Sequence, residues 1–99
     1  MLEFKIKTKV WKYQGTAGWF FASVPKKTTA DLKKLLKGSA KPWGSYKVKV
    51  KIGNTTWSTS LFSDTKSKSL LLPIKKEIRK KEGIIEDQIV EIRFTFLNL

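Results

Sequence analysis

The sequence predicts a mainly β protein with two short helices, and three observations support this fold class. Apolar and polar residues alternate with period two in several stretches, most regularly over 46–52 and 89–96. Two segments with the apolar spacing of a helix interrupt these stretches. The resulting order, ββαβ followed by ββαβ, indicates an internal repeat. Two such halves, related by a pseudo-twofold axis, would close six strands into a barrel.

Each expected strand is an alternating or apolar run bounded by turn residues or proline. In the first strand, Leu2, Phe4 and Ile6 face one way, and the charged residues between them face the other. Gly53 and Asn54 form a hairpin turn signal between the third and fourth strands. The expected strands are 2–10, 19–24, 46–52, 55–62, 70–72 and 89–96.

The first helix is expected near 29–37. Thr28 or Thr29 is placed to accept an amide hydrogen bond as its N-cap, and Gly38 is its expected C-terminal stop. Its apolar stripe consists of Leu32, Leu35 and Leu36.

The second helix is expected near 74–82, with Gly83 as its stop. Pro73 ends the strand before it, as Pro25 ends the strand before the first helix, and the two prolines lie 48 residues apart. This spacing supports the internal repeat. The core of the barrel is expected to include Trp19, Trp57, Phe94 and Leu35.

Composition limits the classes of function. The 99 residues make one domain, 1–99, and contain neither cysteine nor histidine. Thiolate metal sites, disulfides, cysteine nucleophiles and Ser-His-Asp triads are therefore excluded. The eight carboxylates form no catalytic pair, so we expect no enzyme activity, no metal and no cofactor. No apolar run is long enough to span a membrane, and we expect a cytoplasmic monomer or homodimer.

The formal net charge of +13 is large for a domain of this size. Nineteen of the 21 cations are lysines, whereas proteins that read nucleic acid favour the planar fork of arginine. The charge therefore favours a solvated lysine surface over a specific anion site. Weak, non-specific binding of polyanions at low salt is still expected.

The first candidate site is a ligand pocket on the fourth strand. A row of hydroxyl groups beside a tryptophan can line a pocket, but cross-strand hydroxyl pairing and core packing explain the same pattern and are preferred. The residues of this candidate pocket are Trp19, Trp57, Ser58 and Ser60.

The second candidate site is a basic patch on the second helix. Together with Trp43 or Trp57, it would bind a single strand of nucleic acid by stacking and phosphate contacts. The preferred alternative is a solvated helix face with Ile74 and Ile78 turned inward. The patch consists of Lys75, Lys76, Arg79 and Lys80.

Two rows of lysines lie on strand faces, Lys5, Lys7 and Lys9 on one strand and Lys47, Lys49 and Lys51 on another. Such rows would repel each other on neighbouring strands. We therefore expect the rows to be separated, to have acids such as Glu91 and Glu3 between them, or to hold an anion.

Three stretches, 18–25, 52–62 and 72–83, carry a resemblance that covers nearly the whole chain. In order and spacing they resemble an uncharacterised prokaryotic small-barrel domain that is often fused to a YdeI/OmpD-associated bacteriocin-protection domain. The resemblance implies a closed six-stranded β-barrel of the double-split type with two helices, and it implies no established activity.

A second, partial resemblance concerns residues 72–84, which resemble the strand–proline–helix element of AbrB-like and MazE-like swapped-hairpin barrels. Glu86 and Asp87 stand where that pattern has a Gly-Asp turn. Because that class includes DNA-binding proteins that use this region in dimers, the resemblance adds weight to nucleic-acid binding. We expect a non-enzymatic binding or structural domain of unknown function, with a nucleic-acid-binding domain as the alternative.

Overall fold

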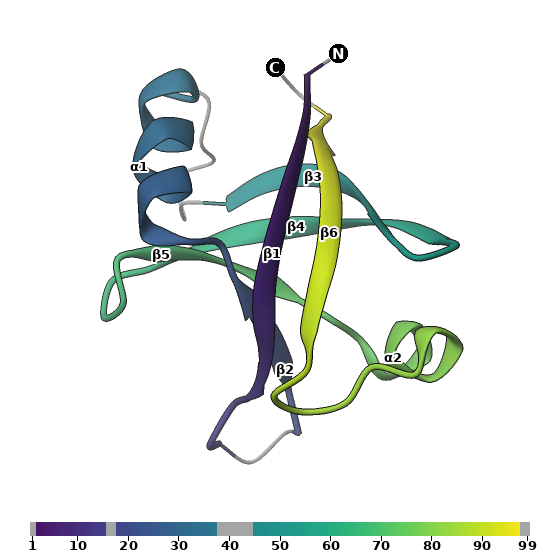
Figure 1. Ribbon diagram of the computed structural model, residues 1–99. Helices are drawn as coiled ribbons and strands as arrows, with labels where there is room; N and C mark the ends of the chain where they lie inside the picture. The colour runs from purple at the N-terminus through teal and green to yellow at the C-terminus, as the bar shows by residue number, and fades with distance from the viewer. Residues whose placement is uncertain (1, 16–17, 38–44, 98–99) are drawn as a thin grey trace.

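The protein folds as a closed β-barrel of six strands with two helices outside it (Figure 1). The computed structural model describes residues 2–15, 18–37 and 45–97. The mainly β fold class and the six-stranded barrel are thus confirmed. The elements are β1 (Glu3–Lys12), β2 (Phe20–Ser23), α1 (Lys26–Leu35), β3 (Ser45–Ile52), β4 (Thr55–Asp64), β5 (Ser69–Pro73), α2 (Lys76–Glu82) and β6 (Ile89–Phe96).

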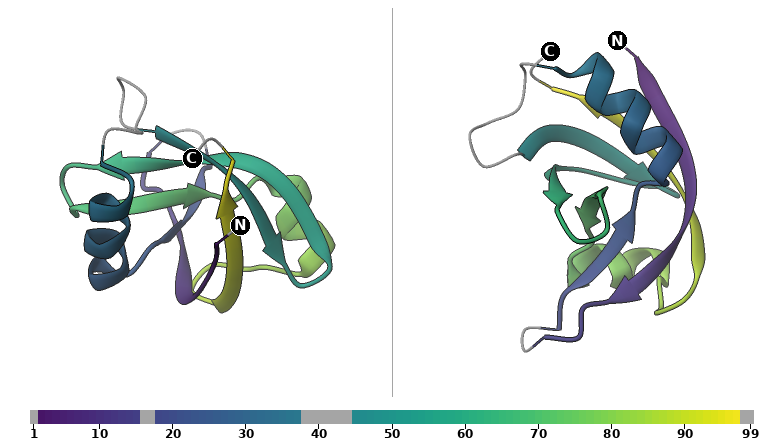
Figure 2. Two further views of the ribbon diagram at one scale, coloured as in Figure 1. Left: turned by 90° about the horizontal axis from the view of Figure 1, so that it is seen from above. Right: turned by 90° about the vertical axis from the view of Figure 1, so that its left-hand side faces the viewer.

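The strands follow the order β1-β2-β5-β4-β3-β6 around the barrel, and β6 pairs with β1 to close it. All six pairings are antiparallel. Along the chain the elements run ββαβ and then ββαβ, as expected, while the internal repeat itself stays a prediction. The two helices lie on opposite sides of the barrel, α1 beside β5 and α2 beside β4 (Figure 2).

Because side chains alternate between the two faces of a strand, one face of every strand packs into a single apolar core. Phe94 is only 1% exposed, as predicted, and its ring stacks on that of Phe4 with the centroids 5.6 Å apart. Trp57 is half-buried and packs against the same core. The alternating lysines therefore all point outward, and the barrel wall is apolar inside and basic outside.

Two predicted core residues are exposed instead. Trp19 is 51% exposed because it has the same parity as Phe21, whose face of β2 points outward, whereas Phe20 and Ala22 have the inward parity. Leu35 is 53% exposed because it lies about 100° around the helix axis from the buried Leu36. The predictions of core positions for Trp19 and Leu35 were therefore wrong.

The helix starts also differ from the predictions. α1 begins at Lys26, directly after Pro25, and has no side-chain cap. Thr29 is buried inside the helix, where its hydroxyl donates to the carbonyl of Val24 and accepts from the amide of Leu70. It therefore ties α1 to β5 instead of capping the helix. The expected stop at Gly38 lies outside the described residues.

The second helix begins at Lys76, because Ile74 is buried and its amide donates to the carbonyl of Phe20 at 2.9 Å. Gly83 ends the helix with φ of 63°, as predicted. In the following loop, Asp87 has φ of 68°, and its amide donates to the carbonyl of Val10 at 2.7 Å. Aspartate tolerates this left-handed conformation better than most residues, so it supplies the turn without a glycine.

The two lysine rows are separated, because β6 lies between β1 and β3 in the barrel. Lys5 and Lys7 of β1 stand opposite Arg93 and Glu91 of β6. On its other side, β6 places Arg93 opposite Lys51. The alternative that the rows are separated is confirmed. Of the two acids expected between them, Glu91 lies on β6 between the rows, whereas Glu3 lies on β1 itself.

Candidate functional site

The main candidate site is a groove of about 730 Å³. It lies between the start of β2, the connection from β5 to α2, and the middle of β4. Aromatic rings form its walls and three cations border it. The side chains that matter for its chemistry are Trp19, Phe20, Phe62, Lys75, Lys76 and Arg79.

The backbone around Pro73 positions the cations of the groove. Pro73 is the last residue of β5 and stands opposite Phe21 of β2. The next residue, Ile74, is fixed by its amide hydrogen bond to Phe20, and Arg79 donates its amide to the carbonyl of Lys75 at 3.1 Å. The first turn of α2 is therefore held against the start of β2.

Two aromatic side chains of the groove are exposed to solvent. Trp19 stacks one face of its indole on Phe21, with centroids 5.9 Å apart and an interplanar angle of 12°. The Phe21 ring is itself supported by Trp11, whose ring centroid lies 5.2 Å away. Phe62 of β4 is 42% exposed. Exposed rings fixed by a supporting ring are suited to stacking on a planar ligand.

Arg79 lies over the inner wall of the groove. Its guanidinium carbon is 3.8 Å from the centroid of the Phe20 ring, a cation–π contact. Its Nε is buried and has no hydrogen-bond partner among the described residues. A guanidinium presents five N–H donors in a fixed plane, so Arg79 places fixed donors beside the groove that it lines.

The structure brings together parts of both predicted sites. Trp19, from the predicted pocket, lies in one groove with Lys75, Lys76 and Arg79 of the predicted basic patch, whereas Lys80 does not line it. The sequence-based prediction missed Phe20 and Phe62. A phenylalanine at the outward parity of β4 was the available signal for Phe62.

The remaining residues of the predicted pocket lie elsewhere. Trp57 has the inward parity of β4, and its Nε1 is buried without a partner among the described residues. Ser58 and Ser60 have the outward parity and stand opposite Lys49 and Lys47 of β3. Successive residues of a strand face opposite sides, so Trp57 and its serine neighbours do not share a surface. Trp43 lies outside the described residues.

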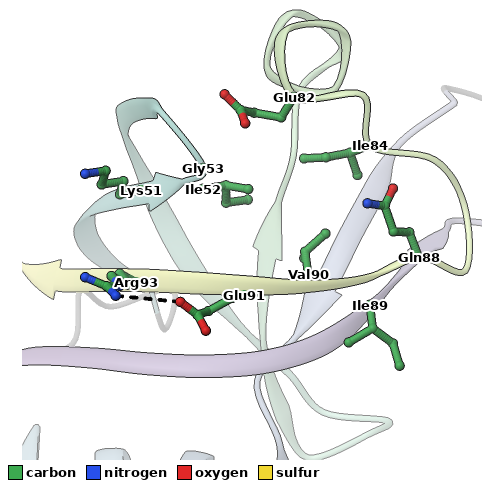
Figure 3. Close-up of a pocket in the computed structure, with 10 residues that line it drawn as sticks. All are labelled: Lys51, Ile52, Gly53, Glu82, Ile84, Gln88, Ile89, Val90, Glu91 and Arg93. Atoms are coloured by element: carbon green, nitrogen blue, oxygen red, sulfur yellow. Dashed lines mark ion pairs between the residues drawn. The ribbon is translucent and has the colours of Figure 1, made fainter.

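A second cleft, of about 480 Å³, lies between β6, the β3–β4 hairpin and the end of α2 (Figure 3). Its charges are mixed, with Glu82 and Glu91 facing Lys51 and Arg93. Arg93 pairs with Glu91 at 3.7 Å, and Glu82 accepts a hydrogen bond from Thr55. Both carboxylates therefore already have partners within the chain, and we favour the groove as the binding site.

The residues that the structure describes contain no group of three or more acidic side chains placed to hold a metal ion. Among the helices of those same residues, none has the length and apolar character to cross a membrane.

Comparison with known proteins identifies the family to which the chain belongs. No curated protein matches it. The model of one family, described as a domain of unknown function (DUF1905), matches residues 7–94. This finding agrees with the resemblance to an uncharacterised domain family, while the fused partner domain and the likeness to AbrB-like barrels stay predictions. Because the match covers most of the chain, this protein belongs to the DUF1905 family.

Proposed function

We propose that this chain is a non-catalytic binding domain, and that its groove binds a ligand with a planar apolar body and an anionic group. One observation carries the proposal: two exposed aromatic side chains, Trp19 and Phe62, share a groove with Lys75, Lys76 and Arg79. The proposal includes the cytoplasmic location and the monomeric or homodimeric state expected from the sequence.

The aromatic walls support a planar ligand body. Leaving Trp19 half-exposed forgoes part of the hydrophobic gain that burying it would give. Clustered exposed apolar side chains on a small domain are typical of binding sites. The free face of the Trp19 indole, opposite its stack on Phe21, is the surface on which a ring would lie.

The charges of the groove support an anionic group on the ligand. No carboxylate lines it among the described residues, although the nearby cleft contains Glu82 and Glu91. Lys75 and Lys76 are exposed and supply mobile cations, while Arg79 supplies a fixed one. The groove therefore attracts anions without an internal acid to compete for its cations.

The functional groups of the groove support binding rather than catalysis. Its polar side chains are Thr59 and the three cations. The chain has no histidine or cysteine to act as a base or nucleophile. A bound ligand would meet stacking surfaces and hydrogen-bond donors, which are the components of recognition.

Binding of 1-naphthyl phosphate tests the proposal, since this probe joins a planar body to a phosphate. Titrations followed by two-dimensional amide NMR should move the signals of Trp19, Ile74 and Lys75. Inorganic phosphate and 1-naphthol, which each carry one half of the probe, should bind more weakly. Trp19→Ala should weaken binding of the probe at least about fivefold, as expected when one stacking surface is removed.

Matched variants separate the groove from the surface in general. Tyr13 is 50% exposed and also contacts Phe21, but it does not line the groove, so Tyr13→Ala is the control for Trp19→Ala. Lys80→Gln serves likewise as the control for Lys76→Gln. Equal losses of affinity in a variant and its control would contradict the proposal, as would signal changes confined to another face.

A further inference from the structure

We propose that the groove is one end of a track for an unpaired strand of nucleic acid, which continues across β4 onto the lysines of β3. This inference rests on the proposed function, because it names the class of ligand whose base stacks in the groove. The track consists of Trp19 and Phe62 at the groove, Ser60 and Ser58 on β4, and Lys47 and Lys49 on β3.

The register of the barrel makes this surface continuous. Phe62, Ser60 and Ser58 succeed one another at the outward parity of β4, so they lie in a row on its outer face. Ser60 stands opposite Lys47, and Ser58 stands opposite Lys49. β3 and β4 run side by side across the barrel, so the row leads directly from the groove to the two lysines (Figure 1).

The spacing along the track suits an extended polyanion. Side chains two residues apart on one strand face are separated by about 6.6–6.8 Å, so Lys47 and Lys49 present two cations at that interval. Both lysines are exposed on the outer face. The hydroxyl groups of Ser58 and Ser60 add donors between the lysines and the groove. Each phosphate of an extended strand would therefore lie near a serine hydroxyl or a lysine side chain of the track.

The distribution of acids favours the lysines of β3 over those of β1. On the β1 side, Lys7 stands opposite Glu91, and Glu3 lies on the same outer face. Arg93 lies 3.7 Å from Glu91 and 4.0 Å from Glu3, so the carboxylates gather there. On the β3 side, Lys49 stands between Thr95 and Ser58, with no carboxylate opposite it. Carboxylates therefore offset the positive potential of the β3 lysines less than that of the β1 lysines.

A single strand fits the track better than a duplex does. Stacking on Trp19 or Phe62 needs a free base face, which an unpaired strand offers and a duplex keeps inside its own stack. Lysines act as point charges without the bidentate fork that reads base edges, so no sequence preference is expected.

The salt dependence of binding to a fluorescein-labelled thymidine octamer tests the track. For single strands, the slope of log K against log salt changes by about 0.7 for each phosphate that the protein neutralises. The double variant Lys47→Gln/Lys49→Gln should therefore reduce the slope by about 1.4, measured by fluorescence anisotropy. The matched control is Lys5→Gln/Lys7→Gln, which removes the same charge from the outer face of β1. It should leave the slope close to that of the unmodified protein.

Three outcomes would overturn the track, and one of them would leave the proposed function standing. Equal slope changes in both double variants would overturn the track, because a diffuse field would then explain the attraction. The octamer should bind at least about tenfold more tightly than thymidine monophosphate, since several contacts act together. Equal affinity of the two, with Trp19→Ala weakening both, would overturn the track and leave the groove intact. Tighter binding of a duplex than of the octamer would also overturn the track.

Discussion

Thr55 Oγ1 donates a hydrogen bond to Glu82 Oε2 at 2.5 Å, which ties the last residue of α2 to the first residue of β4. The carboxylate of Glu82 also lies against Gly53, so closely that a Cβ at this glycine would overlap Glu82 Oε1. One side chain thus fixes the end of α2 to the β3–β4 hairpin. The relationship has consequences for stability that mutations can measure.

Removal of this contact should destabilise the fold. The hydrogen bond is partly buried, and a hydrogen bond to a charged group contributes more than one between neutral groups. Glu82→Ala should lower the free energy of unfolding by about 1–2 kcal/mol in urea denaturation. Glu86→Ala, at an exposed carboxylate in the loop after α2, is the control and should change it by less than about 0.5 kcal/mol.

A side chain at Gly53 should also destabilise the fold. Its φ of 57° is in the left-handed region, and Gly53→Ala should cost about 1–2 kcal/mol from backbone conformation alone. The overlap with Glu82 adds to this cost, so the two variants should be coupled. In a double-mutant cycle, Gly53→Ala should cost at least about 0.5 kcal/mol less when Glu82 is already alanine. Strict additivity would show that the carboxylate moves away freely.

Phe94 is buried in the core, whereas Leu35 is exposed on α1. Phe94→Ala should lower the free energy of unfolding by about 3–5 kcal/mol, since it leaves a cavity beside Phe4 and Phe96. Leu35→Ala should change it by no more than about 0.5 kcal/mol, because Leu35 is exposed on α1. A loss below about 1 kcal/mol for Phe94→Ala would contradict its position in the core.

The carboxyl of Asp64 should titrate below its ordinary range. The Ser67 hydroxyl, 2.6 Å from Oδ2, is the largest cause of the lowered pKa. Partial desolvation opposes it, while the backbone N–H groups of Ser67 and Lys66 and the charge of Lys66 lower the pKa further. The carboxylate therefore stabilises the fold at pH values above the ordinary pKa of aspartate, and this contribution is lost as the pH falls through the folded-state value.

Carboxyl NMR across an acid titration measures this pKa. Ser67→Ala removes the hydroxyl donor and should raise the pKa of Asp64 toward its ordinary value. Ser63→Ala, beside Asp64 on the exposed end of β4, is the control and should leave the pKa unchanged. An unchanged value in Ser67→Ala would show that the hydroxyl does not set the pKa.

The net charge of +13 should give weak, non-specific binding to heparin or DNA at low salt. Counterion release makes this binding fall steeply as the salt concentration rises. Titrations with matched random and genomic fragments should show no preference. Nanomolar affinity for one fragment near physiological salt would instead indicate specific recognition. No binding even at about 20 mM salt would show that the charges are too dispersed to form a patch.

Much of the barrel could be predicted from the sequence, because alternation along a strand is a local property. The run 46–52 alternates without interruption, and β3 covers it almost residue for residue. The hairpin turn at Gly53 and the stop at Gly83 also follow from single residues with left-handed backbones. The start of α1 could not be predicted in this way, because the Thr29 hydroxyl does not cap its own helix. It accepts a hydrogen bond from the amide of Leu70 on β5.

The sequence predicted some residues of the groove, but it did not predict that they lie together. Trp19 and Lys75 were recognised separately, and they meet because β2 pairs with β5, a pairing between segments about fifty residues apart. Which outward side chains become neighbours depends on the order of strands around the barrel. Phe62 joins them because β4 is the other neighbour of β5. Local sequence patterns predict which face of its strand a residue occupies, but they do not predict which strand is its neighbour.

The closure of the barrel limits how far the strands beneath the groove can move apart. Trp19 directly precedes β2, and Phe62 belongs to β4, so the two aromatic walls stand on either side of β5. Phe62 stands opposite Leu71 of β5, and Leu71 stands opposite Ser23 of β2, so Trp19 and Phe62 face each other diagonally across β5. In the closed ring, β2 and β4 each have a ladder on both sides, so neither strand can move outward unless ladders break. Accommodation of a ligand is therefore expected from the side chains of Trp19 and Phe62 and not from movement of β2 and β4.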